Sequence, residues 1–532
     1  MAGVKLSGIE RRAVLAAEDR DGRWAMASYP VVLSFRGATT NEWNVSVLFV
    51  KDRGAPAAVV EADMGGVTWN VRPIAEIPLH EPKMIVYRCD VAACRSAGEV
   101  RLSIDGFPVT FAVPGPNESP RIAYGACNGF SDPKAMKSVA SKNDRWEHLL
   151  QQHALGAYHL LLLGGDQVYA DEIWKSNGPL YEWTELSKKK RLKKAWTKDL
   201  RDEVDKFYCQ LYLTRWVQRG VHEALTSIPT VMMWDDHDIF DGWGSYEEDL
   251  HQCPVYQGVF EIARRYFRIF QQQLADGETH PAAIPGQSAF NMGFAGLGKI
   301  ALLVLDLRSE RHPDLRNATP PKPAQVIALE TANAIYEWLD GTSGHEHLLV
   351  MSSIPVAYLD LGFLERMLSA LPGQQELEDD LRDHWRSESH LQERKRLIHR
   401  LLRHATDKDH PRRVTILSGD VHVAAAGLIE AVRAEYTGSG RVVHQLISSA
   451  IVHPAPPALV RYVLEQISDR VEEVEPGITA SMQLMGAKGG RLIGQRNWLS
   501  VEPDQNDALW ANWHIEGMIS PITKVIHPAI AE

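Results

Sequence analysis

Four runs of the chain combine consecutive apolar residues with an aspartate at the end. They lie at residues 159–166, 230–236, 301–306 and 414–420. Because apolar and polar positions do not alternate within them, each run predicts a strand that is buried on both faces, with helices outside the sheet. Ligands bind at the carboxyl ends of such strands. Aspartate is a poor strand residue, so these terminal aspartates are the first candidates for a functional site.

The first part of the chain has a different pattern, with short β-branched and aromatic runs separated by turn residues. These runs lie at residues 31–35, 43–50, 84–87, 100–104 and 109–113. Asp105-Gly106 between the last two is typical of a β-hairpin turn. We predict a small all-β, sandwich-like domain over residues 1–116. A stretch rich in proline and glycine at 114–120 marks its end.

Residues 117–532 predict an α/β domain. Besides the four buried runs, it contains a short strand at 122–125, a helix near 138–155 and a further buried strand at 442–447. Charged helical inserts are expected near 185–225 and 360–405. The segments at 497–501 and 509–515 predict a β-hairpin that returns to the sheet.

Composition and charge argue against several classes of function and location. The 532 residues carry 57 basic and 68 acidic side chains, a net charge of -11, which argues against a general nucleic-acid binder. The sequence has no apolar stretch of the length that a membrane span needs. Only five apolar residues follow Arg11-Arg12, too few for a secretory leader, and the five cysteines show no disulfide spacing. We therefore expect a cytoplasmic protein without a nucleic-acid or membrane partner.

Acidic and imidazole side chains gather at the predicted strand ends, beside one thiol and one phenol. In chain order they are Cys127, Asp166, Tyr169, Asp171, Asp235, Asp236, His237, Asp238, Asp420 and His422. So many carboxylates would repel one another if they met without a cation. A metal centre is the simplest explanation, and about six candidate ligands favour two ions over one.

The motifs that hold these residues resemble a known family. Gly165-Asp166-x-x-Tyr169, the block Asp235-Asp236-His237-Asp238 and Gly419-Asp420-x-His422 are similar, together with Cys127 and Leu305–Ser309, to motifs of the PhoD-like family of calcineurin-like metallophosphoesterases. They follow the family's order over roughly residues 118–455. The resemblance implies two packed mixed sheets flanked by helices. It also implies hydrolysis of phosphomonoesters, phosphodiesters or both by a dinuclear centre and a hydroxide held by the metals.

The resemblance also assigns roles within the centre. An iron(III)-type ion is held by the residues that match the family's ligands, Cys127, Asp166, Tyr169 and His422. Asp166 then bridges to a second ion, completed by Asp236 and Asp420, whose oxygen ligands suit calcium, with zinc, manganese or magnesium as alternatives. His237 matches the proton donor, and Asp166 and Arg308 complete the catalytic set.

Further residues are expected around the centre. Arg308 and Asn128 are candidates to contact the substrate phosphate. Asp171, Asp235 and Asp238 are expected to orient the ligands without binding metal themselves. His453, which follows the strand at 442–447, is close enough in sequence to reach the centre, but turn chemistry explains it equally well.

Two other interpretations stay open at this point. One keeps the dinuclear site but makes a phospholipid or a nucleotide diester the substrate. The other is a metal-stabilised binding or scaffold protein without activity. In the favoured interpretation, the partner is a small phosphoester substrate, while the sequence leaves the exact substrate, the second metal and the oligomeric state undetermined.

Overall fold

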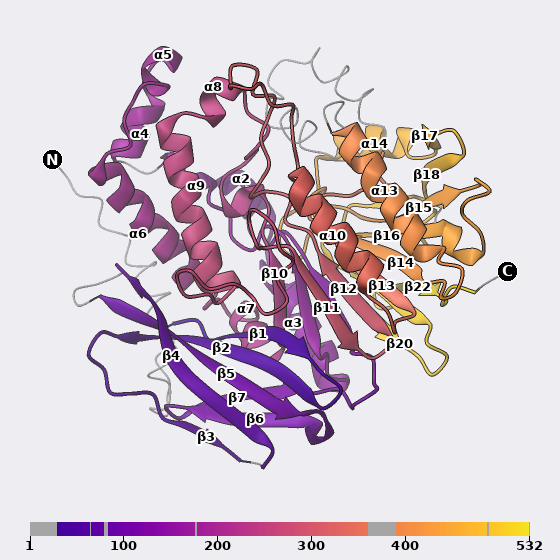
Figure 1. Cartoon of the computed structure of the whole chain (residues 1–532). Helices are drawn as coiled ribbons and strands as arrows, with labels where there is room; N and C mark the ends of the chain where they lie inside the picture. Colours follow the sequence, from indigo (N-terminus) through magenta and orange to yellow (C-terminus); the bar gives the residue numbers. More distant parts are fainter. Residues whose placement is uncertain are drawn as a thin grey trace.

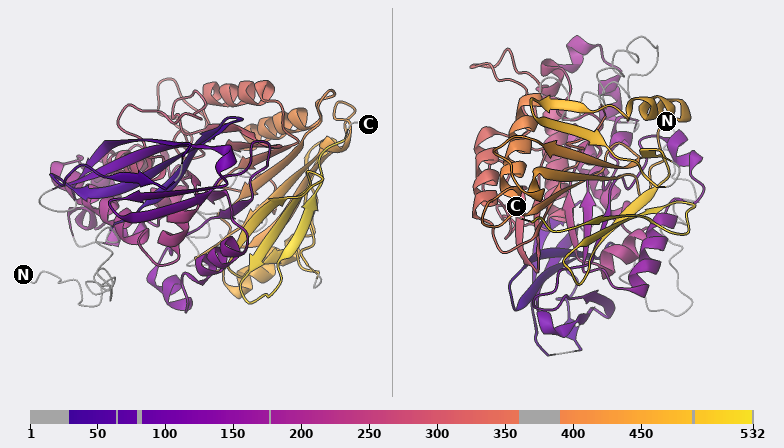
Figure 2. Two further views of the ribbon diagram at one scale, coloured as in Figure 1. Left: turned by 90° about the horizontal axis from the view of Figure 1, so that it is seen from below. Right: turned by 90° about the vertical axis from the view of Figure 1, so that its right-hand side faces the viewer.

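The computed structural model describes residues 29–63, 65–78, 83–175, 178–359, 390–486 and 489–530. Two large mixed sheets, with helices on their outer sides, form most of the protein (Figures 1 and 2). The predicted mixed α/β fold with a β-rich N-terminal region is confirmed.

The first large sheet has ten strands. In spatial order they are β22 (Ile522–Ile526), β21 (Leu509–Ile515), β20 (Asn497–Pro503), β8 (Ile122–Gly125), β9 (Leu160–Gly164), β10 (Thr230–Met233), β1 (Val32–Ala38), β2 (Glu42–Asp52), β5 (Met84–Cys94) and β4 (Val67–Ile77). Strands β8, β9 and β10 are parallel neighbours. The predicted C-terminal hairpin is β20–β21, and β20 pairs with β8.

The second large sheet has nine strands. They are β11 (Met292–Leu297), β12 (Ile300–Val304), β13 (His347–Met351), β14 (Arg413–Ser418), β16 (Val442–Ser448), β15 (Ala424–Ala431), β18 (Ile478–Met482) and β17 (Glu472–Glu475), with β19 (Leu492–Ile493) paired to β15. Strands β12, β13, β14 and β16 run parallel to one another.

A small third sheet contains β3 (Val60–Ala62), β6 (Glu99–Ile104) and β7 (Phe107–Ala112). Its hairpin turn is the predicted Asp105-Gly106, because Ile104 pairs with Phe107 and both turn residues have positive φ, 49° and 81°.

The helices lie between the strands in sequence. They are α2 (Pro133–Ser138), α3 (Asp144–Leu155), α4 (Pro179–Thr184), α5 (Lys188–Arg191), α6 (Lys198–Arg215), α7 (Val221–Ser227), α8 (Glu248–His251), α9 (Pro254–Tyr266), α10 (Leu329–Gly341), α13 (Leu391–Ala405) and α14 (Ala458–Ile467). Single turns are η1 (Arg95–Ala97), η2 (Asp171–Lys175), η3 (Asp236–Asp238), the π-turn η4 (Phe267–Gln271) and η5 (Ser439–Arg441).

The helical predictions hold in part. The helix expected near 138–155 begins only at Asp144, after a break that follows α2. Helices α5, α6 and α7 fill most of the insert expected near 185–225. Of the insert near 360–405, residues 360–389 lie outside the described residues, and α13 occupies the rest. No helix in the described ranges is long and apolar enough to cross a membrane.

The buried runs pack on both faces, as their composition predicts. In β9, Leu160 and Leu162 belong to the core between the large sheets, whereas Leu161 and Leu163 face the core under α3, α6 and α9. In β12, Leu302 faces the core between the sheets, and Leu303 joins the core under α10 and α13. Figure 1 shows α10 and α13 side by side in front of β12, β13 and β14.

The β-rich N-terminal region continues the first large sheet. Strand β1 runs parallel to β10, with Ser34 opposite Thr230, and β2, β5 and β4 extend the sheet beyond it. Side chains of β2, such as Val47, share one core with Leu102 of β6, while β3, β6 and β7 form their own small sheet. The division at residue 116 therefore separates two segments of sequence whose strands lie in a common sheet.

Candidate metal centre

The candidate ligands come from loops at one edge of the two large sheets. Cys127 follows β8, Asp166 follows β9 and Asp236 follows β10, while Asp420 follows β14 of the facing sheet. Because β8, β9 and β10 are parallel neighbours, their carboxyl ends meet at the same edge. The strand-end pattern in the sequence therefore becomes a group in space.

Backbone strain is concentrated in these loops. Positive φ angles, uncommon for residues other than glycine, occur at Cys127 (57°), Asp166 (56°), Asp420 (68°) and His422 (51°). Left-handed backbone at such residues costs free energy and persists where the surroundings impose it. Sharp turns at these positions aim the side chains from the strand ends toward one another.

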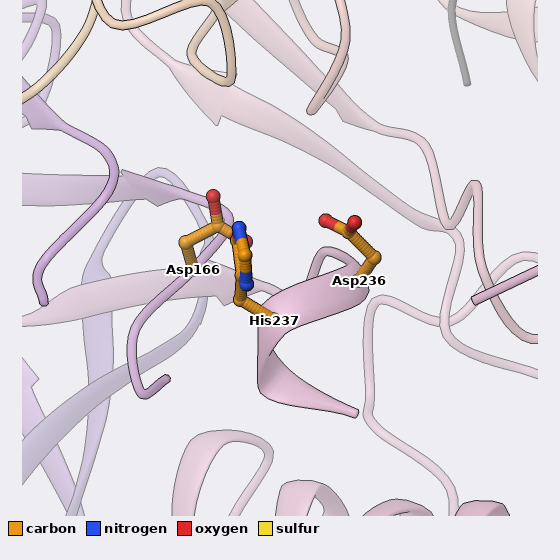
Figure 3. A group of neighbouring side chains, drawn as sticks. All are labelled: Asp166, Asp236 and His237. Carbon is orange, nitrogen blue, oxygen red and sulfur yellow. The ribbon is translucent and has the colours of Figure 1, made fainter. Parts of the chain in front are cut away.

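Asp166, Asp236 and His237 form the tightest cluster. One potential ligand atom from each lies within 4.8 Å of the others, and Figure 3 shows His237 between the two carboxylates. Asp166 Oδ1 is buried and has no hydrogen-bond partner among the described residues. A buried carboxylate oxygen without a donor is costly unless a cation binds it. These residues therefore fit a metal ion.

The thiol of Cys127 lies beside the Asp166 carboxylate, and the phenol of Tyr169 lies beside His422. Cys127 Sγ is 3.4 Å from Asp166 Oδ2, and the hydroxyl oxygen of Tyr169 is 3.5 Å from His422 Nε2. Burial raises the pKa of the Cys127 thiol and the pKa of the Tyr169 phenol well above their ordinary values, and the Asp166 carboxylate raises both further. Both groups become anionic ligands only next to a cation, which displaces their protons.

Asp420 also interacts with the Cys127 thiol. Its charge adds to the rise in the pKa of Cys127, while its backbone N–H donates to that thiol. The backbone N–H of His422 donates to Ser449 Oγ (3.1 Å), and this hydroxyl is also 3.1 Å from Cys127 Sγ. Ser449 thus connects the loops after β8 and β14.

Like charges crowd the centre. Burial raises the pKa of Asp166 well above its ordinary value. His237 opposes this rise, and the carboxylates of Asp235 and Asp236 add to it. Two carboxylates this close cannot both stay ionised in a buried site without a compensating cation.

His237 is held by Asp171. Its Nδ1 is 2.9 Å from Asp171 Oδ2, which leaves Nε2 available to the cluster, and its ring stacks on Tyr169. Burial disfavours the charged imidazole, but Asp171 and Asp236 outweigh this effect and raise the pKa of His237 well above its ordinary value. A carboxylate behind an imidazole is also the usual support of a histidine ligand. The predicted proton donor is thus placed where it can also bind metal, a role that the sequence analysis did not assign.

Asp238 joins the two loops that carry the cluster. Its carboxylate accepts the backbone N–H groups of Gln167 (3.1 Å), Val168 (3.1 Å) and Asp235 (2.9 Å). Burial raises the pKa of Asp238 to about 7, although these hydrogen bonds oppose the shift. With its carboxylate turned to the backbone, Asp238 holds the loops after β9 and β10 together, and its expected role in orienting the metal ligands stays a prediction.

Arg308 lies beneath the carboxylates. Its guanidinium is fully buried, pairs through Nε with Asp235, lies 3.3 Å from Asp236 Oδ1 and donates from Nη1 to the carbonyl of Trp243 (3.1 Å). These contacts orient Asp235 and Asp236, and the contact with a substrate phosphate stays a prediction.

Asn128 is also occupied within the protein. Its Oδ1 accepts from Trp146 Nε1 (3.0 Å), and its Nδ2 donates to the carbonyl of Gln167 (3.3 Å). The side chain is buried. These bonds hold the loop after β8 against α3 and against the loop after β9, while the predicted substrate contact stays a prediction.

His453 belongs to the centre, although the sequence analysis did not select it. Its ring stacks on His422 with 3.8 Å between ring centroids and on Tyr169 with 5.7 Å. Its Nδ1–H donates to the carbonyl of Pro454 (2.8 Å), so Nε2 is the atom that accepts from Ser131 Oγ (3.2 Å). Its position after the buried strand β16 was the available signal, the same signal that identified the aspartates.

Two packed mixed sheets with a buried polar centre at their strand ends make this a mixed α/β protein with a candidate metal site. Comparison with known proteins identifies its family. The model of the PhoD-related phosphatases matches residues 117–375 and 349–474. The chain therefore belongs to the PhoD-related phosphatase family.

Two individual proteins are similar over most of the chain. The uncharacterized protein YGR266W of Saccharomyces cerevisiae is 26% identical over 519 residues, covering 80% of this chain and 72% of the yeast protein. A solved structure titled "Structure of PhoD" superposes with a TM-score of 0.56 at 15% identity, covering 94% of this chain and 89% of that one. At that identity the structural match supports the fold alone.

Proposed function

We propose that the protein is a metal-dependent phosphoester hydrolase that acts on a small phosphoester substrate. The observation that carries the proposal is the convergence of Asp166, Asp236 and His237 within 4.8 Å at the strand ends of a PhoD-like fold. When bound, two metal ions polarise the phosphoryl group and lower the pKa of water enough to make a nucleophile near neutral pH. The residues of the chain would hold those ions and donate or accept the protons of the reaction.

The proposed ligands form two sets that differ in their donor atoms, and this difference supports two different ions. Cys127, Tyr169 and His422 offer sulfur, phenol and imidazole atoms, which suit iron(III). Asp236 and Asp420 offer only oxygen atoms, which suit calcium or another hard divalent ion. Asp166, which lies between these sets, is the proposed bridging ligand.

His237 is the proposed proton donor to the leaving group. Asp171 fixes the ring by its bond to Nδ1, so Nε2 is the atom that moves a proton. If His237 binds metal instead, replacing Asp171 weakens metal binding; if His237 donates a proton, the same change alters the pH profile of turnover. The Asp171→Asn variant therefore separates the two roles.

Replacing the bridging carboxylate tests the proposal directly. Asp166→Asn removes one negative charge at nearly constant shape, so we expect turnover of an aryl phosphate to fall by more than about 100-fold, the upper range seen for groups that only support a ligand. Circular dichroism should stay unchanged. Asp314→Asn, at an exposed loop carboxylate, is the matched control. Unchanged turnover in Asp166→Asn would overturn the proposed function.

Elemental analysis identifies the metal ions, and a pair of substrates distinguishes phosphatase from phosphodiesterase activity. About one iron and one second ion per chain would support the thiol–phenol site, whereas two zinc or manganese ions would argue against ligation by Cys127 and Tyr169. Comparing kcat/KM for an aryl monoester and an aryl diester then decides between phosphatase and phosphodiesterase activity. Metal-replete protein without any hydrolysis would favour a binding protein.

A further inference from the structure

Three consecutive glutamines at the end of the π-turn η4 are almost completely buried. Gln271, Gln272 and Gln273 are exposed by 1%, 2% and 0%, respectively. Glutamine is mostly a surface residue, and each buried amide must find partners within the protein. Their partners lie in three different parts of the structure.

Gln271 reaches the metal centre. Its Nε2 donates to Asp238 Oδ1 (2.8 Å) and to the hydroxyl of Tyr212 on α6 (3.0 Å). Asp238 in turn accepts the backbone N–H groups of the loops that carry Asp166 and Asp236. Gln271 thus holds the Asp238 carboxylate, which in turn accepts hydrogen bonds from both loops.

Gln272 and Gln273 connect the same turn to the sheet. Gln272 Nε2 donates to the carbonyl of Met232 in β10 (2.8 Å). Gln273 Nε2 donates to the carbonyl of Val32 in β1 (2.9 Å), and Ser46 of β2 donates to Gln273 Oε1 (2.7 Å). One turn therefore binds the metal-site loop, the adjoining strand and the N-terminal strands.

The N-terminal region also grips the backbone of this turn. Arg36 of β1 donates to the carbonyl of Gln272 (2.9 Å), and Arg88 of β5 donates to the carbonyl of Gln273 (2.5 Å). Both guanidinium groups are buried. Hydrogen bonds from charged donors are the stronger kind, so the turn cannot shift without breaking them.

We propose that Gln271 is a positioning residue of the metal centre and that Gln273 anchors it to the N-terminal β-rich region. In this arrangement β1 and β2 act on the centre through Gln273, Gln271 and Asp238. The hydrogen bonds themselves do not depend on the proposed function. Only the consequence for metal binding rests on it.

Amide hydrogen exchange tests the first part without requiring metal. Gln271→Leu removes both donated bonds at similar volume, so Asp238 loses a partner. We expect the amides of Gln167, Val168 and Asp235, which donate to Asp238, to exchange about tenfold faster in the full-length variant. Loss of metal to a chelator should also be about 10- to 100-fold faster, the range typical of groups that support a ligand.

A matched control separates positioning from general destabilisation. Thr331→Val removes a buried bond to Glu310 at α10, and it should lower the melting temperature while leaving those three amides and metal retention unchanged. If Gln271→Leu behaves like Thr331→Val in both measurements, the positioning role is wrong. If Gln271→Leu accelerates the exchange of these amides while the unmodified protein shows no hydrolase activity, the proposed function is overturned and this inference stands.

The link to the N-terminal region needs a double-mutant cycle. Gln273→Leu alone should accelerate exchange of the same three amides by a smaller factor, since its effect travels through Gln271. In the Gln271→Leu background it should add little, because the connection is already broken. Full additivity of the two effects, or no effect of Gln273→Leu, would overturn the anchoring role.

Discussion

Aspartates at strand ends have different roles in this protein, although the sequence presents them alike. Asp166 and Asp236 belong to the cluster that could hold a metal ion. Asp306 instead accepts from Trp234 Nε1 (2.8 Å) and from the backbone N–H groups of Arg308 and Ser309, so it shapes a turn. The difference arises from the neighbours that folding supplies, which a local pattern does not contain.

Arg308 shows the same dependence on surroundings, and its role can be tested by substitution. Arg308→Gln leaves Asp235 and Asp236 without their buried cation, so the free energy of unfolding should fall by about 3 kcal/mol or more in metal-free protein. Urea denaturation measures this. The matched control, Arg316→Gln at an exposed ion pair, should change it by less than about 0.5 kcal/mol. Unchanged stability together with a large rise in KM would support the phosphate contact instead.

Strands that are buried on both faces match the apolar runs in the sequence, whereas a strand at the edge of a sheet does not. Fully buried β9 and β12 match their apolar runs closely. Edge strand β4 was not expected from the sequence, because most of its side chains are polar or partly exposed. Its pairing with β5 determines its conformation more than its own composition does.

The turn after the glutamines is tied to the strands by Glu278, which gives a pH-dependent prediction. Burial alone would raise the pKa of Glu278, but bonds from Arg88, the Ala275 N–H and Arg72 lower it to about 2 from an ordinary 4.5. The stabilisation is therefore present above about pH 4.5 and is lost as the pH falls toward 2.

Thermal unfolding at several pH values measures this effect. Glu278→Gln should melt about 1–3 °C below the unmodified protein near pH 7, and the difference should shrink steadily between about pH 4.5 and 2. The exposed Glu435, whose pairing with Arg433 is 3.5 Å long, provides the control Glu435→Gln. A difference that is constant with pH would contradict the assigned ion pairs.

The whole molecule is organised around a sheet that crosses the proline- and glycine-rich linker. The strands from before the linker, β1, β2, β5 and β4, continue the strands from after it, since β1 pairs with β10. Their side chains share one core that also includes the second large sheet. The segment 1–116, predicted as a domain from its short strands and the linker that follows them, thus contributes strands to the sheet that carries the candidate metal centre.

Truncation tests how far the two segments depend on each other. A chain that begins at residue 117 would expose the edge of β10 and the apolar core side chains that β1 and β2 cover. We expect it to be poorly soluble or to lack a cooperative unfolding transition, because open apolar edges aggregate. A soluble fragment with a cooperative transition and bound metal would instead support two independent domains.

Local sequence was enough to predict the buried strands, the Asp105-Gly106 hairpin and the gathering of acidic and imidazole side chains at strand ends, because these depend on side-chain period and residue type within a few positions. The sharing of one sheet across the linker, the burial of Arg308, the inclusion of His453 and the contacts of Gln271 were decided only by tertiary structure. Those features depend on which strands become neighbours and which loops meet. Contacts between residues far apart in the chain determine that outcome, and the period of a single segment carries no information about them.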